Sequence, residues 1–203
     1  MTRTGIPARL LIVGPQGSGK GTQGTRISEL FGIPAVSTGD VFRANITQGT
    51  ALGRQVQAII KAGDLVPDEL TSEVVRDRLT QPDAAGGFLL DGYPRNLGQV
   101  ADLDAFLGER DEQLTGVVEL SVPREESIAR LSVRASEQGR ADDTVEAIAH
   151  RLAIYERETA PILDVYRGRG IVDQIDGVGT LDEITDRIVD ALEARGLVRR
   201  AAV

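Results

Sequence analysis

The chain has 203 residues, of which 41% are hydrophobic and 27% charged, and this size and balance are typical of one globular domain with small insertions. It contains no cysteine, which excludes disulfide frameworks, thiol nucleophiles and cysteine-bound zinc. No apolar run is long enough to cross a bilayer and the first residues lack a secretory signal, so we expect a cytoplasmic protein that does not act at a membrane. The formal net charge of −8 argues against broad nucleic-acid binding, which depends on a basic surface.

Five short apolar runs alternate with segments of helical periodicity along the chain. The runs are residues 9–13, 34–37, 87–91, 117–121 and 171–175. Strands that alternate with helices and are apolar on both faces indicate a parallel sheet that is covered on both sides. We therefore predict an α/β fold with a five-stranded parallel sheet and helices on both faces.

The clearest functional signal follows the first run, where residues 14–20 read Gly-Pro-Gln-Gly-Ser-Gly-Lys before a helical segment. Glycines allow the backbone to turn its N–H groups inward as an anion-binding nest, and the start of the next helix adds positive potential. Lys20 can then reach the outer phosphates of a bound nucleotide. The order of a strand, the motif G-x-x-x-x-G-K and a helix predicts a P-loop. The alternative is a tight turn between strand and helix, which would not need the lysine.

This loop departs from the usual pattern at the position that binds magnesium. Gly21 stands directly after the lysine, where a Ser or Thr is usual, and the hydroxyl comes one residue later at Thr22. Mg²⁺ must then depend more on water and on another anion. Asp91 is the candidate, because the carboxyl ends of parallel strands face the ligand crevice.

Two segments interrupt the alternation of strands and helices. Residues 38–66 form a long, mainly helical excursion between the second and third runs. Residues 134–142 lack hydrophobic periodicity and separate a helix containing Ile128 and Leu131 from one that begins near Asp143. A polar, arginine-bearing loop of this kind is either a mobile flap or a solvated connector. We interpret it as a candidate flap, although periodicity alone favours the connector.

The last helix has clear boundary signals at both ends. Thr180 and Glu183 stand in the relation of a capping box, in which each side chain accepts a hydrogen bond from the backbone of the other. Gly196 is a typical residue just past a helix end. We expect residues 197–203 to form a frayed tail.

Taken together, the motifs resemble those of the adenylate kinases, nucleoside monophosphate kinases that transfer a phosphoryl group from ATP to AMP. The resemblance covers roughly residues 10–192. It is carried by the P-loop at 14–22, Ser-Thr-Gly-Asp with a following arginine at 37–43, Gly-Asp-Leu-Val-Pro at 63–67, Asp-Gly-Tyr-Pro-Arg with a following glutamine at 91–99, the arginines and aspartates of 130–151, and Gly-Val-Gly at 177–179.

The resemblance implies the architecture of a P-loop nucleoside monophosphate kinase. It implies a single kinase domain over residues 1–203, with a helical monophosphate-binding insertion at 38–67 and a short lid loop at 134–142. Long-lid relatives insert a small β domain, sometimes with four zinc-binding cysteines. Because this chain has a short loop and no cysteine, it resembles the short-lid form, and we expect no zinc.

The resemblance also implies how AMP is held. Arg43 and Arg95 can each bind a pair of phosphate oxygens, and the Gln99 amide can pair with an adenine edge. The family pattern suggests a cis bond between Tyr93 and Pro94. The implied AMP-binding residues are Thr38, Arg43, Asp64, Leu65, Val66, Gly92, Tyr93, Pro94, Arg95, Gln99, Arg140 and Arg151.

On the ATP side, the resemblance implies a ring of arginines over the transferring phosphoryl group. Arg130 and Arg134 are four residues apart, so they project from one helix face, and their structural alternative is salt bridging to Glu126 or Glu137. The implied ATP-binding residues are Gly17, Ser18, Gly19, Lys20, Gly21, Thr22, Arg134 and Gly179. The implied catalytic residues are Lys20, Arg95, Arg130, Arg134, Arg140 and Arg151.

The expected reaction is Mg²⁺·ATP + AMP ⇌ 2 ADP, carried out by a monomer whose only partners are ATP, AMP and ADP. Mg²⁺ is the expected cofactor, held at Asp91 through water. A UMP/CMP kinase of the same fold and a non-catalytic P-loop module are the alternatives that the residues leave open. We expect His150, the only histidine, to be exposed and not catalytic, and Asp40 can simply cap the helix that carries Arg43.

Overall fold

In a computed structural model of the protein, residues 6–138 and 144–200 are described, and within these residues five strands form one parallel sheet. The order across the sheet is β2-β3-β1-β4-β5, and every neighbouring pair is parallel. The bounds are β1 (Ala8–Val13), β2 (Ala35–Ser37), β3 (Gly87–Asp91), β4 (Gly116–Ser121) and β5 (Val172–Asp176). Each strand end lies within one residue of its predicted run, which confirms the fold class.

The central strand, β1, leads the chain into a crevice at one edge of the sheet. It lies between β3 and β4, with Ile12 beside Asp91 and Val13 beside Glu119. The sheet continues to β2 on one side and to β5 on the other, so the strand order switches direction at β1. Parallel sheets hold ligands at such a switch point, outside the carboxyl ends of the strands.

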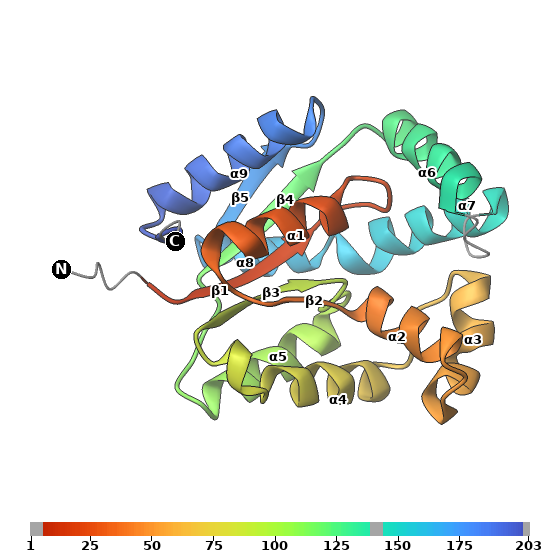
Figure 1. Ribbon diagram of the computed structural model, residues 1–203, viewed down its shortest axis with the longest axis horizontal. Helices are drawn as coiled ribbons and strands as arrows, with labels where there is room; N and C mark the ends of the chain where they lie inside the picture. The colour runs from red at the N-terminus through yellow and green to blue at the C-terminus, as the bar shows by residue number, and fades with distance from the viewer. Residues whose placement is uncertain (1–5, 139–143, 201–203) are drawn as a thin grey trace.

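Helices cover both faces of the sheet, with α1 and α9 on one face and α4, α5 and α8 on the other (Figure 1). Alternate residues of β1 enter the two cores, because successive side chains on a strand point to opposite faces. The elements are α1 (Lys20–Phe31), α4 (Asp68–Leu79), a 3₁₀ turn η1 (Pro82–Ala84), α5 (Leu97–Gly108), α8 (Ile162–Gly168) and α9 (Leu181–Ala194).

The excursion between β2 and β3 is helical, as predicted. It contains α2 (Thr38–Thr47) and α3 (Ala51–Ala62), which lie to one side of the sheet (Figure 1). Phe42, Val56 and Val66 form a small core of their own beneath these helices. The excursion is therefore a packed unit that projects beside the crevice.

Helix α6 (Arg124–Gln138) is longer than predicted, because it includes residues 134–138, which were expected to open the lid loop. Ala, Glu and Gln in this stretch are good helix formers even without a hydrophobic stripe, so periodicity alone missed them. The next helix, α7 (Val145–Ile154), begins after Thr144, whose Oγ1 accepts a hydrogen bond from Ala147 N at 3.2 Å. It continues as a π-helical turn, η2 (Tyr155–Thr159), before α8.

The capping box of α9 is present: Glu183 N donates to Thr180 Oγ1 at 3.2 Å, and Thr180 N donates to Glu183 Oε2 at 2.8 Å. Residues 197–200 differ from the prediction of a frayed tail at 197–203, and residues 201–203 of that prediction lie outside the described part of the chain. Leu197 is buried in the α1–α9 core, and Arg200 N donates to Leu30 O at 2.9 Å. No helix within the described ranges has both the length and the apolar character of a membrane span.

Candidate active site

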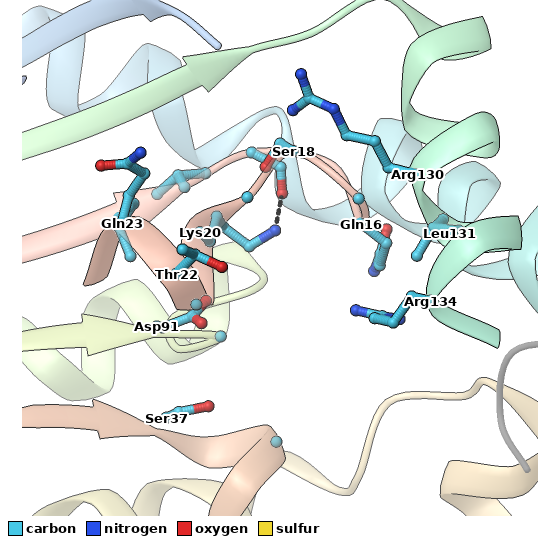
Figure 2. Close-up of a pocket in the computed structure, with 18 of the residues that line it drawn as sticks. Gln16, Ser18, Lys20, Thr22, Gln23, Ser37, Asp91, Arg130, Leu131 and Arg134 are labelled. Carbon is cyan, nitrogen blue, oxygen red and sulfur yellow. Dashed lines mark hydrogen bonds between the residues drawn. The ribbon is translucent and has the colours of Figure 1, made fainter. Parts of the chain in front are cut away.

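A cleft of about 910 Å³ lies at the carboxyl ends of the strands. The P-loop and the first turn of α1 form its floor, α2 borders one side, and α6 and α7 border the other (Figure 2). A smaller pocket of about 70 Å³ adjoins it beneath the α2–α3 insertion. The two cavities share five lining residues, which are Gly39, Arg43, Gly92, Arg95 and Arg151.

The P-loop has the backbone that its glycines predict. Gly17 has φ 82° and Gly19 has φ 94°, a left-handed conformation that side chains rarely adopt. A Cβ at Gly17 would lie 2.5 Å from Ser127 O, so α6 packs directly on the loop. The first turn of α1 holds no acidic residue and has no side-chain cap. The positive end of the helix is thus directed at the cleft, where an anion would be stabilised.

Lys20 folds under this loop (Figure 2). Its Nζ donates hydrogen bonds to Gly14 O at 2.7 Å and to Pro15 O at 2.8 Å. Burial lowers the pKa of Lys20 to about 8, with Asp91 opposing that shift and nearby guanidinium groups adding to it. An anion bound above the loop would stabilise the charged ammonium.

Asp91 ends β3 beside the P-loop and next to Thr22 (Figure 2). Burial raises its pKa, and no side chain in the described part of the protein donates a hydrogen bond to its carboxylate. Gly21 lies close by, since a Cβ there would be 3.9 Å from Asp91 Oδ2. A desolvated carboxylate without a donor, facing a phosphate-binding loop, suits a hard cation that keeps most of its water ligands, as Mg²⁺ does.

Arg95 is held at several points in the turn after β3. Its Nε donates to Gly92 O at 2.7 Å, and Thr38 Oγ1 donates to the same oxygen at 2.9 Å. Its backbone carbonyl accepts a hydrogen bond from Thr159 Oγ1 at 2.8 Å, and its backbone N–H donates to Gln99 Oε1 at 2.8 Å. Burial lowers the pKa of Arg95. The guanidinium therefore faces the junction of the two cavities from a fixed backbone.

The insertion brings Arg43 to the same junction. Its Nη2 lies 2.6 Å from Asp40 Oδ1, in an ion pair with both side chains partly exposed. Asp40 does not cap α2, which was the structural alternative for this residue, because Ser37 is the cap and accepts a hydrogen bond from Asp40 N at 3.3 Å. Gly39 leaves the room that Arg43 occupies, since a Cβ at this glycine would be 3.0 Å from Arg43 Nη2.

Arginines of α6 line the opposite side of the cleft (Figure 2), and α7 contributes Arg151 to the lining. Arg130 makes the salt bridge to Glu126, at 2.7 Å, that was its structural alternative, and it also donates to Gly177 O at 3.0 Å. Arg134 and Arg151 line the cleft as well. Arg140 lies outside the described residues.

The cavities bring together most of the predicted ligand-binding residues, but not Tyr93. This side chain is buried in the core between the sheet and α5, where its hydroxyl lies 3.0 Å from Ser72 Oγ, and its bond to Pro94 is cis, as predicted. The predicted AMP-binding residues that line the smaller pocket are Thr38, Arg43, Asp64, Leu65, Val66, Gly92, Arg95, Gln99 and Arg151, and Pro94 lines the cleft. The predicted ATP-binding residues that line the cleft are Gly17, Ser18, Gly19, Lys20, Gly21, Thr22, Arg134 and Gly179.

Several cleft residues were missed by the sequence analysis. Leu181 follows the glycine motif after β5, so its position in the chain could have revealed it. Gln16 lies inside the predicted P-loop motif but was not named as a ligand-binding residue. Leu131, Tyr155 and Thr159 carry no such signal, because they come from helical segments that only the fold brings to the cleft. His150 is exposed, as predicted, and its Nε2 lies 2.7 Å from Asp64 Oδ1 of the insertion.

The P-loop follows the central strand of a parallel sheet, and arginines from a helical insertion and from the turn after β3 lie opposite it. This arrangement defines the class of P-loop nucleoside monophosphate kinases. The family model described as "Adenylate kinase" matches residues 12–171. The chain belongs to the adenylate kinase family, enzymes that transfer a phosphoryl group between ATP and AMP.

Curated relatives support the same assignment. The adenylate kinase of Leifsonia xyli subsp. xyli is 57% identical over 93% of this chain and 95% of the relative. The adenylate kinase of Bifidobacterium longum is 52% identical over 91% of this chain and 100% of the relative. The adenylate kinase of Thermobifida fusca is 50% identical over 92% and 99%, respectively.

Proposed function

We propose that this cleft transfers the terminal phosphoryl group of Mg²⁺-bound ATP to AMP, giving two ADP, with the residues named above in the following roles. The observation that carries the proposal is the junction of the two cavities. Lys20 lines the cleft, Gln99 lines the smaller pocket, and Arg43 and Arg95 line both. Two anionic nucleotides can therefore lie end to end with their phosphates between these cations.

In this proposal the P-loop holds the donor. Backbone N–H groups of residues 17–22 and the start of α1 bind the ATP phosphates, and Lys20 balances their charge. Gly179 and Leu181 border the end of the cleft where the rest of ATP would lie. The lowered pKa of Lys20 supports this role, because its charge is poorly solvated until an anion arrives.

Arg43 and Arg95 hold the acceptor phosphate in line with the donor, and Gln99 contacts the base. No general base is needed, because the attacking oxygen of a phosphate monoester is already anionic. Alignment alone can supply roughly 7–11 kcal/mol of the barrier reduction. The several hydrogen bonds that fix Arg95 support such a positioning role.

Mg²⁺ would be held by the Asp91 carboxylate, through water, with the Thr22 hydroxyl nearby. When bound, the ion supplies charge neutralisation on the ATP phosphates. The absence of donors to Asp91 within the described residues supports this assignment over a purely structural carboxylate.

We further propose that the insertion at 38–67 and the lid at 134–142 close over the nucleotides. Arg130, Arg134, Arg140 and Arg151 would then surround the transferring group, and closure would exclude water that could hydrolyse ATP. We also propose that the enzyme is a monomer that acts on free nucleotides in the cytoplasm.

Measuring ADP formation from ATP and AMP tests the proposal. Lys20→Ala should lower kcat/KM by at least about a hundredfold, because a preorganised cation over the phosphates is lost. Lys61→Ala is the matched control, since Lys61 is the only other lysine and is exposed on α3. ATP binding without ADP formation would indicate a non-catalytic module, and a preference for CMP or UMP would overturn the choice of acceptor.

A further inference from the structure

A carboxylate outside both cavities contacts the side chain that faces the acceptor base. Asp68 is the first residue of α4, directly after the insertion, and it lines neither the cleft nor the smaller pocket. Gln99 Nε2 donates to Asp68 Oδ1 at 2.7 Å. Asn96 Nδ2 also donates to Asp68, at 3.0 Å to Oδ1 and 3.1 Å to Oδ2.

This network permits only one orientation of the Gln99 amide. A carboxylate only accepts hydrogen bonds, so the amide NH₂ of Gln99 must face Asp68. A backbone N–H only donates, so the amide oxygen must face Arg95 N, which lies 2.8 Å away. Flipping the amide would place two oxygens together at Asp68 and two donors together at Arg95.

The fixed amide still has groups available for a ligand. One N–H of Gln99 Nε2 and one lone pair of Oε1 remain, and Gln99 borders the smaller pocket although its side chain is almost fully buried. Adenine presents an amino donor beside a ring-nitrogen acceptor, which is complementary to this pair. A 6-oxo purine presents an oxygen where adenine has its amino group, and that oxygen would face Oε1.

We propose that Asp68 is a specificity-determining positioning residue, which fixes the Gln99 amide so that the pocket accepts a 6-amino purine monophosphate and rejects a 6-oxo one. The inference rests on the proposed function, in which Gln99 contacts the acceptor base. Asp68 acts through Gln99 and does not itself touch the nucleotide. Its effect is therefore on the choice of base and not on the ATP side of the reaction.

The test compares AMP with inosine monophosphate (IMP), which carries the 6-oxo group, as acceptors at saturating ATP. Asp68→Asn keeps the shape of the side chain but can donate as well as accept, so only the contact with Arg95 N still opposes a turn of the Gln99 amide. We expect the ratio of kcat/KM for AMP to that for IMP to fall about tenfold, with the KM for ATP unchanged. This ratio does not depend on the fraction of folded enzyme, so partial loss of folding cannot mimic the result.

Glu69→Gln is the matched control. Glu69 is an exposed carboxylate in the same first turn of α4, so the variant loses the same charge near the helix N-terminus without touching Gln99. It should leave the AMP to IMP ratio unchanged. An equal loss of activity on AMP and IMP in Asp68→Asn, or an unchanged ratio, would overturn the inference and leave Asp68 with a structural role only.

A double-mutant cycle separates this inference from the proposed function. In a Gln99→Leu background, Asp68→Asn should cause no further change in the ratio, because its effect requires the amide. A further change there would overturn the inference. A wild-type enzyme that forms no ADP from AMP, or uses IMP equally well, would refute the proposed function or the role of Gln99, and the inference with it.

Discussion

At the scale of single residues, the site depends on charges that the fold holds partly out of water. Lys20 bonds to the carbonyls of its own loop, and Asp91 has no donor within the described residues. Burial favours the neutral form of each group, so it lowers the pKa of the lysine and raises the pKa of the aspartate. Both groups are thus poised to gain from a bound ligand of opposite charge, a phosphate for one and a cation for the other.

This predicts a pH dependence of ATP binding. The pKa of Lys20 is about 8 in the free protein, and the phosphates of bound ATP would raise it, so binding takes up a proton as the pH rises above about 8. ATP affinity measured by calorimetry should therefore fall from pH 8 to pH 9.5. Lys20→Arg should lack this dependence, because arginine stays protonated over the whole range. An equally steep loss in Lys20→Arg would show that another group titrates.

Thr159 offers a second test at this scale, because its hydroxyl holds the backbone of Arg95 from the π-helical turn η2. Thr159→Val removes the hydrogen bond but keeps the shape of the side chain. We expect the KM for AMP to rise about fivefold and the free energy of unfolding to fall by about 1 kcal/mol, with the KM for ATP unchanged. A matching rise in the KM for ATP would contradict a role confined to Arg95.

At the scale of elements, the insertion depends on the close approach of two helices. A Cβ at Gly53 of α3 would lie 2.1 Å from Asn45 O of α2, so only glycine fits at this crossing. The closeness of the two helices lets Phe42, Val56 and Val66 form a separate small core. The insertion can therefore hold Arg43 and the smaller pocket in place without contributing to the cores that flank the sheet.

Gly53→Ala should accordingly impair the part of the site that the insertion forms and leave the P-loop side intact. Overpacking at the crossing should destabilise the insertion by about 1–3 kcal/mol, so AMP binding weakens while ATP binding persists. Gly108→Ala on α5 is the control, because a Cβ there meets no atom within 4 Å. Titrations of AMP and ATP measure the two affinities separately, and an equal loss of both would show that the insertion is not an independent unit.

At the scale of the whole molecule, the proposed nucleotide sites lie between parts that we propose approach each other when both nucleotides bind. The cleft has the P-loop and the first turn of α1 as its floor, the insertion on one side, and α6 and α7 on the other (Figure 2). His150 of α7 contacts Asp64 of the insertion, with its Nε2 2.7 Å from Asp64 Oδ1. Closure on two nucleotides should shorten the distance between the insertion and the body of the protein.

The absence of native cysteine makes this distance measurable with engineered labels. Gln57→Cys on α3 and Asp190→Cys on α9 place dyes on exposed positions of the insertion and of the body. Energy transfer between them should increase when ATP and AMP analogues are bound together. Unchanged transfer in a doubly labelled enzyme that retains activity would contradict closure of the insertion.

What the sequence by itself determined is local or periodic. The five parallel strands followed from short apolar runs, the P-loop from the spacing of glycines and Lys20, and the start of α9 from Thr180 and Glu183, because each of these patterns acts over a few neighbouring residues. The family motifs then predicted the arginines that line one cleft, apart from Arg140, which lies outside the described residues.

Only the tertiary structure decided which distant groups meet. It placed Tyr93 in the core, packed residues 197–200 against α1, and brought Thr159 to the backbone of Arg95. It also placed Asp68 against Gln99, 31 positions further along the chain. Such contacts depend on how helices dock on the sheet, and packing of this kind leaves no signature in the sequence near either partner.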